Sequence, residues 1–154
     1  MVCMLAPVPG EHLETGLNVV QQFGKVAFGS QLIKEFHTWW REYGDELPVL
    51  IYASKSGAPS KIFVPGAPTV RWQARLVGVE IGDKLGRYPG GDQFRPMTTK
   101  DDRAASVFWV VRDLKPTQQP IPISKLRSAT SGKLLASTPP LRPLLVEDVD
   151  DLER

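Results

Sequence analysis

The residues best suited to chemistry are aromatic and cationic side chains that alternate along one extended segment. Over residues 69–81, an extended chain places Arg71, Gln73 and Arg75 on one face and Trp72 on the other. Aromatic rings stack on nucleobases, and arginine contacts phosphate and stacks through its planar guanidinium. The pattern therefore indicates a nucleic-acid-binding surface. The alternative is a solvent-exposed strand face over an ordinary core, which residue types alone favour.

Standard catalytic and metal-binding motifs are not recognisable in the chain. His12 and His37 have no cysteine or carboxylate motif around them, so they do not indicate a zinc site. The Gly-rich stretch 88–92 lacks the Gly-Lys-Ser/Thr ending of a phosphate-binding loop, and no Gly-x-Ser-x-Gly elbow occurs. Asp101 and Asp102 are adjacent and would point in opposite directions in an extended segment. We therefore predict no catalytic residue, no metal site and no cofactor.

Residues 82–104 form a long segment without periodicity, and long irregular segments in a compact domain are often functional. This segment combines aromatic and basic residues, namely Arg87, Tyr88, Phe94 and Arg95. A second unusual segment is the acidic end, where the last eight residues hold five acids and one base. We expect that end to be a solvated tail, and either segment is a candidate surface for a protein partner.

The chain's 154 residues suffice for one compact domain with a buried core. The net charge is +2, and the chain without its last eight residues has 18 basic and 12 acidic residues, hence a charge of +6. A mildly basic body is compatible with binding a polyanion, although ordinary surface charge explains it equally well. No segment is apolar enough to span a membrane, the start does not resemble a secretory signal, and Cys3 has no disulfide partner. We expect a cytoplasmic protein.

Hydrophobic periodicity predicts an α+β protein. The clearest helix covers residues 31–43, with Ser30 as its N-cap and Gly44 as its stop. The segment 69–81 is the longest predicted strand, and its apolar pattern changes phase near Gly78, which predicts a bulge. The other predicted elements are a helix over 11–23, strands over 25–29, 48–54, 106–112 and 141–147, an extended connector over 116–122 and a short helix over 124–128.

Four short motifs in this order resemble the PUA-like superfamily, in particular its EVE and ASCH domains. They are the segment 44–54 with its Tyr-x-Ser ending, the strand 72–80, the late strand 108–113 and the lead into a short helix over 119–126. The likeness spans about residues 25–147. The chain lacks the Lys-Ser-Glu-Pro pattern of EVE domains and the Gly-x-Lys-x-x-x-x-Arg signature of ASCH domains.

The resemblance implies a small β-barrel of about five or six strands with flanking helices over residues 25–147. Residues 1–24 would be an N-terminal helical extension, and 148–154 the acidic tail. It also implies a pocket that receives a base, often a modified or flipped one. By position, the base pocket would be formed by Ser30, Tyr52 and Ser54, with Trp39, Trp40 and Trp72 as stacking walls. Phosphate contacts would come from Lys55, Lys61, Arg71 and Arg75.

Three hypotheses follow from these features. The first is a non-enzymatic module that binds DNA, RNA or a modified nucleobase through an aromatic-lined pocket. The second is a small nucleoside-directed hydrolase of the ASCH type, with Lys25 and a carboxylate such as Glu35 in acid–base roles. The third is a protein-interaction domain that uses the 82–104 loop or the acidic tail. We expect no membrane partner.

Overall fold

The computed structural model describes residues 1–55, 68–99, 104–136, 140 and 142–149. In this part the strands are β1 (Val2–Pro9), β2 (Val26–Ser30), β3 (Pro48–Ser54), β4 (Thr69–Ile81), β5 (Val107–Pro122) and β6 (Leu144–Glu147). The helices are α1 (Gly10–Phe23) and α2 (Ile33–Tyr43), and the 3-10 turns are η1 (Gly44–Glu46), η2 (Asp92–Phe94), η3 (Met97–Thr99) and η4 (Ile123–Lys125). The predicted α+β class is confirmed.

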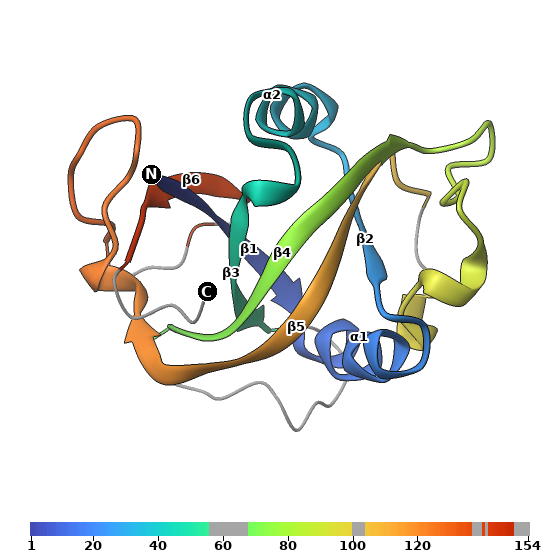
Figure 1. Ribbon diagram of the computed structural model, residues 1–154, viewed down its shortest axis with the longest axis horizontal. Helices are drawn as coiled ribbons and strands as arrows, with labels where there is room; N and C mark the ends of the chain where they lie inside the picture. The colour runs from blue at the N-terminus through green and yellow to red at the C-terminus, as the bar shows by residue number, and fades with distance from the viewer. Residues whose placement is uncertain (56–67, 100–103, 137–139, 141, 150–154) are drawn as a thin grey trace.

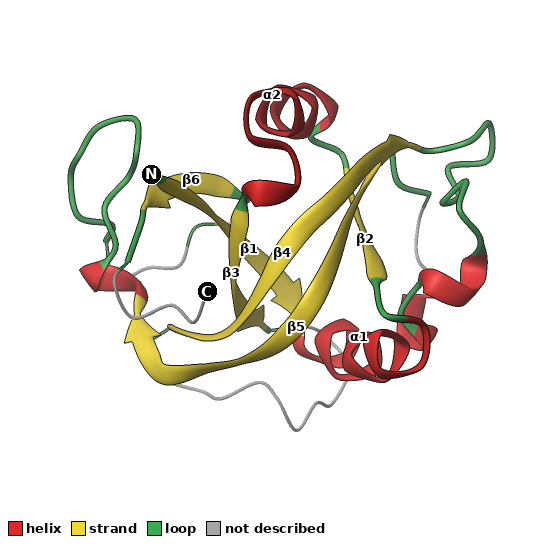
Figure 2. Ribbon diagram, in the orientation of Figure 1, coloured by secondary structure: helices red, strands yellow, loops and turns green. Residues whose placement is uncertain are grey.

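The six strands form one mixed sheet in the order β2-β5-β4-β3-β1-β6 (Figure 1). β1 and β3 run parallel, and the other neighbouring strands run antiparallel. β4 and β5 make a long twisted ribbon, with α2 at the top of the view and α1 at the bottom (Figure 2). The two described helices have 14 and 11 residues, and neither is long and apolar enough to cross a membrane.

Strand β1 is a finding that the sequence analysis does not anticipate. Residues 1–24, expected to be helical, contain the predicted helix α1 and also β1, which lies between β3 and β6. Cys3 and Leu5 are buried on one face of β1, and Met4 and Ala6 on the other. A strand buried on both faces shows no alternation of apolar and polar residues, so periodicity does not reveal it.

Three groups of buried side chains hold the sheet together. The inner core joins both helices to alternate residues of β1–β5, including Met4, Phe28, Ile51, Leu76 and Trp109. The C-terminal core covers the other face near β1, β3 and β6, and it includes Leu5, Leu50, Tyr52, Ile123 and Val146. The loop core contains Ala27, Tyr88, Phe108 and Val110, and it lies under the 82–105 loop. Every strand therefore contributes to at least one core.

The two helices pack where their sequences allow close contact. Phe36 of α2 is fully buried, and its ring packs against those of Trp39 and Trp109 at centroid distances of 5.4 and 5.9 Å. In α1, a Cβ at Gly16 would lie 3.2 Å from the Phe28 ring, so glycine lets this helix approach β2 closely. The cost of glycine in a helix interior is thus offset by this packing.

Register shifts bend β4 against β5. The predicted change of phase near Gly78 is confirmed, because the pairing shifts between Leu76 and Gly78. Further shifts occur between Val70 and Trp72 and between Gln73 and Arg75. As a result Val70 packs in the C-terminal core, whereas Trp72 packs against the inner core. Bulges add twist and turn one strand toward two different cores.

The sheet curls but is not closed by hydrogen bonds in the part of the chain that the structure describes. β2 forms one end of the strand order, and β1 lies next to the other end. Side chains of β1 and β2 nevertheless share the inner core and line a common pocket. The structure thus shows a curled, six-stranded mixed sheet, and the closed barrel stays a prediction.

Two prolines explain why β1 does not continue the ladder toward β2. The Met1 carbonyl accepts the N–H of Asp148 at 3.0 Å, on the β6 side of β1. The backbone groups of strand residues that are an even number of positions apart point to the same edge of the strand. The backbones of Pro7 and Pro9 therefore point to the same edge of β1 as the Met1 carbonyl. They lie beyond Leu5, the last β1 residue paired with β6. Proline has no N–H to donate to a neighbouring strand, and in the part of the chain that the structure describes no strand pairs with this edge.

Replacement of Phe36 by alanine tests the role of α2 in the inner core. We expect Phe36→Ala to lower the free energy of unfolding by about 3–5 kcal/mol, because it removes a fully buried ring that packs against Trp109. His37→Ala, at the exposed next position of the helix, is the control and should change it by no more than about 0.5 kcal/mol. Urea unfolding measures both, and equal losses would contradict this assignment of the core.

Candidate functional site

A pocket of about 240 Å³ occupies the gap between the end of β1 and the end of β2. Its lining comes from β1, α1, β2, the loop after β2, the 82–105 loop and β5: Pro7, Val8, Pro9, His12, Phe28, Gly29, Ser30, Gln31, Arg95, Thr99, Ala105 and Trp109. We call it the gap pocket. The local cause is the pair of prolines in β1, because a continuous ladder between β1 and β2 would fill this space.

The lining of the gap pocket includes two almost fully buried aromatic residues and several polar ones. Phe28 and Trp109 are neighbours in the sheet, with ring centroids 4.8 Å apart. The Ser30 hydroxyl accepts the N–H of Leu32 at 3.2 Å, and His12 Nδ1 lies 2.7 Å from Thr98 Oγ1. The Gln31 amide donates to the Ala104 carbonyl at 3.0 Å and accepts from Ser106. These hydrogen bonds within the protein fix the orientations of the Ser30, His12 and Gln31 side chains before any ligand enters.

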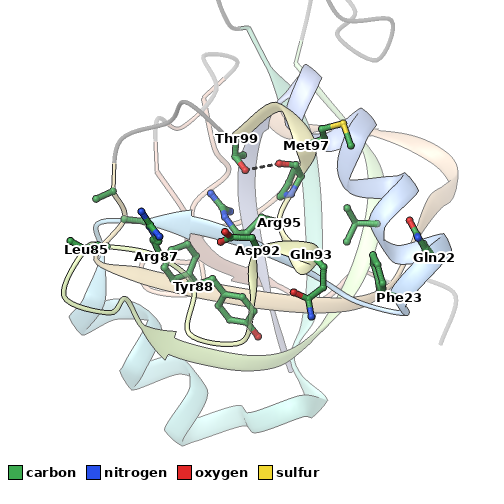
Figure 3. Close-up of a pocket in the computed structure, with 16 residues that line it drawn as sticks. Gln22, Phe23, Leu85, Arg87, Tyr88, Asp92, Gln93, Arg95, Met97 and Thr99 are labelled. Atoms are coloured by element: carbon green, nitrogen blue, oxygen red, sulfur yellow. Dashed lines mark hydrogen bonds between the residues drawn. The ribbon is translucent and has the colours of Figure 1, made fainter.

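A larger pocket of about 660 Å³ adjoins the first, between the end of α1 and the 82–105 loop (Figure 3). We call it the loop pocket. Its lining residues are Val19, Gln22, Phe23, Leu85, Gly86, Arg87, Tyr88, Asp92, Gln93, Arg95, Pro96, Met97, Thr99, Ala104, Ala105 and Phe108. The two pockets share Arg95, Thr99 and Ala105, so they adjoin each other at these residues.

Arg95 lies at the junction and holds the loop on the sheet. Its Nη1 donates to the Ala27 carbonyl at 2.7 Å, and its guanidinium lies 5.0 Å from the centroid of the Phe108 ring. The Ser30 carbonyl accepts the N–H of Ser106, the residue that precedes β5. Because strand residues alternate, the Ala27 carbonyl points to the opposite edge of β2. Arg95 therefore caps an edge carbonyl that no described strand covers.

Residues 83–94 of the loop are organised by one aspartate and three aromatic rings. Asp83 Oδ1 accepts the N–H groups of Leu85 and Arg87, both at 2.9 Å, and the Arg87 bond contributes most to lowering the pKa of Asp83. Tyr88 packs against Phe94 and Phe108 at centroid distances of 6.4 and 5.5 Å. Burial raises the pKa of Tyr88 to about 12, and the neighbouring Glu80 adds to this increase. At neutral pH this ring is a neutral part of the loop core.

Of the predicted base-pocket residues, Ser30 lines the gap pocket. It does not act as an N-cap, because α2 begins only at Ile33 and the Ser30 hydroxyl binds the N–H of Leu32 one residue before it. Tyr52 is 3% exposed within the C-terminal core, and its hydroxyl donates to the Pro140 carbonyl. Ser54 is the last residue of β3 and pairs with Pro9. Neither Tyr52 nor Ser54 lines the gap pocket or the loop pocket.

The predicted stacking walls Trp39, Trp40 and Trp72 are half-buried against the inner core. They therefore share one environment, and none of them lines either of the two pockets. Trp109, which does line the gap pocket, is the tryptophan that the sequence analysis leaves without a role. Trp109 lies in a run of β-favouring residues directly after the 82–104 segment, and this position in the sequence could have indicated that it lies close to the loop.

The predicted phosphate-binding residues are placed as follows. Lys55 is exposed after β3, and Lys61 lies outside the described residues. Arg71 is exposed on β4 and Arg75 is half-buried. Gln73 between them is only 5% exposed and donates to the Pro116 carbonyl at 3.3 Å, so the register shifts of β4 interrupt the expected polar stripe.

The residues of the hydrolase hypothesis are not joined by any interaction that the structure shows. Lys25 Nζ lies 4.7 Å from the centroid of the Phe94 ring, whereas Glu35 is in the first turn of α2. In the described residues no group of three or more His, Cys, Asp and Glu side chains is arranged to hold a metal ion. The acidic tail lies outside the described residues from Asp150 onward.

Replacement of Arg95 tests whether it holds the loop on β2. We expect Arg95→Met to lower the free energy of unfolding by about 1.5–3 kcal/mol, because the Ala27 carbonyl loses a charged donor. Arg87→Met removes the same charge from an exposed position of the loop and should cost no more than about 0.5 kcal/mol. Urea unfolding compares the two variants. A loss no larger for Arg95→Met than for Arg87→Met would refute the assignment.

The two buried tyrosines predict a specific alkaline titration. Burial raises the pKa of Tyr52 to about 12, as it does for Tyr88, from an ordinary value of 10.0. The folded state therefore retains these protons more tightly than the unfolded state. The resulting stabilisation is complete below pH 10 and is lost as the pH rises from 10 to 12. Absorbance at 295 nm should show two of the three tyrosines ionising near pH 12, one fewer in Tyr88→Phe. Ionisation of all three near pH 10 in folded protein would contradict this burial.

No known protein-family model matches this chain, and no curated protein matches it significantly.

Proposed function

We propose that this protein is a non-enzymatic module that binds nucleic acid by accepting one base, unmodified or modified, in the gap pocket. The observation that carries the proposal is the gap between β1 and β2, which combines aromatic walls with orientated polar edges. A base that has left its stack needs both features, an apolar surface for its faces and hydrogen-bonding groups for its edge.

The size of the gap pocket favours a single base. Its volume of about 240 Å³ lies below the ~300–1,000 Å³ typical of pockets for drug-sized ligands, so it suits one planar ring system rather than a whole nucleotide. Phe28 and Trp109 supply the apolar walls, and His12, Ser30 and Gln31 supply donors and acceptors. This combination discriminates between bases through hydrogen bonds while gaining affinity from apolar contact.

The finer fold assignment belongs to the same proposal. We assign the chain to a PUA-like architecture, a small barrel in which β1 and β2 approach each other at the base pocket. Support comes from the inner core, where alternate side chains of β1–β5 converge as they do inside a barrel. In this arrangement Lys55, Arg71 and Arg75 stay candidate phosphate contacts.

Filling the gap pocket tests the proposed function. Labelled single-stranded DNA and RNA decamers of mixed sequence, with and without base methylation, are titrated with the protein by fluorescence anisotropy. We expect binding to at least one of these classes, with an affinity that falls as salt rises because phosphate contacts release counterions. Ser30→Leu should weaken that binding tenfold or more, since its side chain occupies the space of the base.

The matched control is Ser124→Leu, the same substitution at an exposed position of η4, away from both pockets. It should bind as the wild type does, and thermal unfolding confirms that both variants are folded. Saturating titrations that show no binding to any decamer would overturn the proposal. Equal affinities of Ser30→Leu and wild type would move the base out of the gap pocket.

A further inference from the structure

We propose that the loop pocket takes the nucleotide next to the one whose base enters the gap pocket, so that the protein recognises an unpaired strand rather than a free base. This inference rests on the proposed function and assigns a ligand to the second, larger depression. Its volume of about 660 Å³ falls within the ~300–1,000 Å³ that accommodates drug-sized ligands, and therefore a whole nucleotide.

The first argument is that the two pockets adjoin each other. They share Arg95, so a guanidinium lies at the boundary between them. Two neighbouring nucleotides are joined by a phosphodiester, and its negative charge falls at the boundary when the two bases occupy different pockets. Among the described residues that line the loop pocket, two are arginines, Arg87 and Arg95, and one is a carboxylate, Asp92, so the formal charge of this described lining favours an anionic ligand.

The second argument is an exposed apolar surface around the loop pocket. Phe23, Leu85 and Met97 are 43%, 66% and 68% exposed, and all three line this pocket. They are three of the seven exposed large hydrophobic side chains in the described part of the chain, the others being Met1, Ile33, Ile81 and Leu134. Such grouping beside a pocket is typical of a binding site.

The geometry of Phe23 suits base stacking. It is the last residue of α1, and its ring packs edge-on against Phe94 at a centroid distance of 5.7 Å. That contact orients the ring, and the side chain is still 43% exposed. Stacking of a base on an aromatic ring contributes about 1–3 kcal/mol. It needs a base face that no neighbouring base covers, which an unpaired strand offers. Gln22 and Gln93 lie on the same lining and offer amides to the base edge.

The test compares mononucleotides with dinucleotides on the full chain. The 5′-mononucleotide of the base that the wild type prefers is titrated by calorimetry, and so are the dinucleotides that extend it on either side. We expect one dinucleotide to bind at least fivefold more tightly than the mononucleotide, which corresponds to the lower end of the stacking contribution. In Phe23→Ala this advantage should fall to twofold or less, while mononucleotide affinity stays within twofold of wild type.

The control variant is Ile33→Ala, which removes a side chain of similar exposure, 39%, from α2 outside both pockets. It should retain the full dinucleotide advantage. If mononucleotide binding is present but neither dinucleotide binds more tightly, the second subsite is refuted and the gap pocket stands. An advantage that survives Phe23→Ala also refutes it. If no mononucleotide, dinucleotide or decamer binds, both proposals fail.

Discussion

The structure depends on how the backbone groups at the outer edge of β2 find hydrogen-bond partners, since no described strand pairs with that edge. A strand edge exposes carbonyl and N–H groups that must find partners, and β1, the strand that would close the sheet, has prolines where the partner groups would be. Arg95 supplies the missing donor to the Ala27 carbonyl from a loop some seventy residues away, at 2.7 Å. This bond holds the loop on β2 and puts a positive charge at the rim of the gap.

The candidate site follows from that solution. Because no backbone ladder joins β1 and β2 in the described part of the chain, the gap between them retains a volume that side chains line. The loop and β2 lie so close together that a larger residue would not fit at Gly29, because its Cβ would lie 2.8 Å from the Cβ of Ala105. Tyr88 of the loop packs against Phe94 of the same loop and against Phe108 of β5. Because Tyr88 and Phe108 also line the loop pocket, this part of its lining belongs to a packed core.

Local patterns were sufficient for most of the elements but not for all. The helix near 31–43, the strands 48–54 and 69–81 and the bulge near Gly78 follow from the periodicity of neighbouring residues. β1 was not predicted, because both of its faces are buried and its sequence shows no alternation. β5 is longer than predicted, because the prolines in 116–122 indicated a connector instead of a strand. The stripe on β4 failed because register shifts bury Gln73, and such shifts depend on the partner strand.

The sequence by itself determined the fold class, the two helices and the presence of an aromatic and basic loop with Arg87 and Arg95. Only the tertiary structure decided where a ligand could bind. The linings of the two pockets come from elements far apart in the chain, with Phe23, Phe28, Arg95 and Trp109 among them. Periodicity reports which residues share a face of one element. It does not report which faces meet, because that is decided by packing and by the edges that hydrogen bonds leave open.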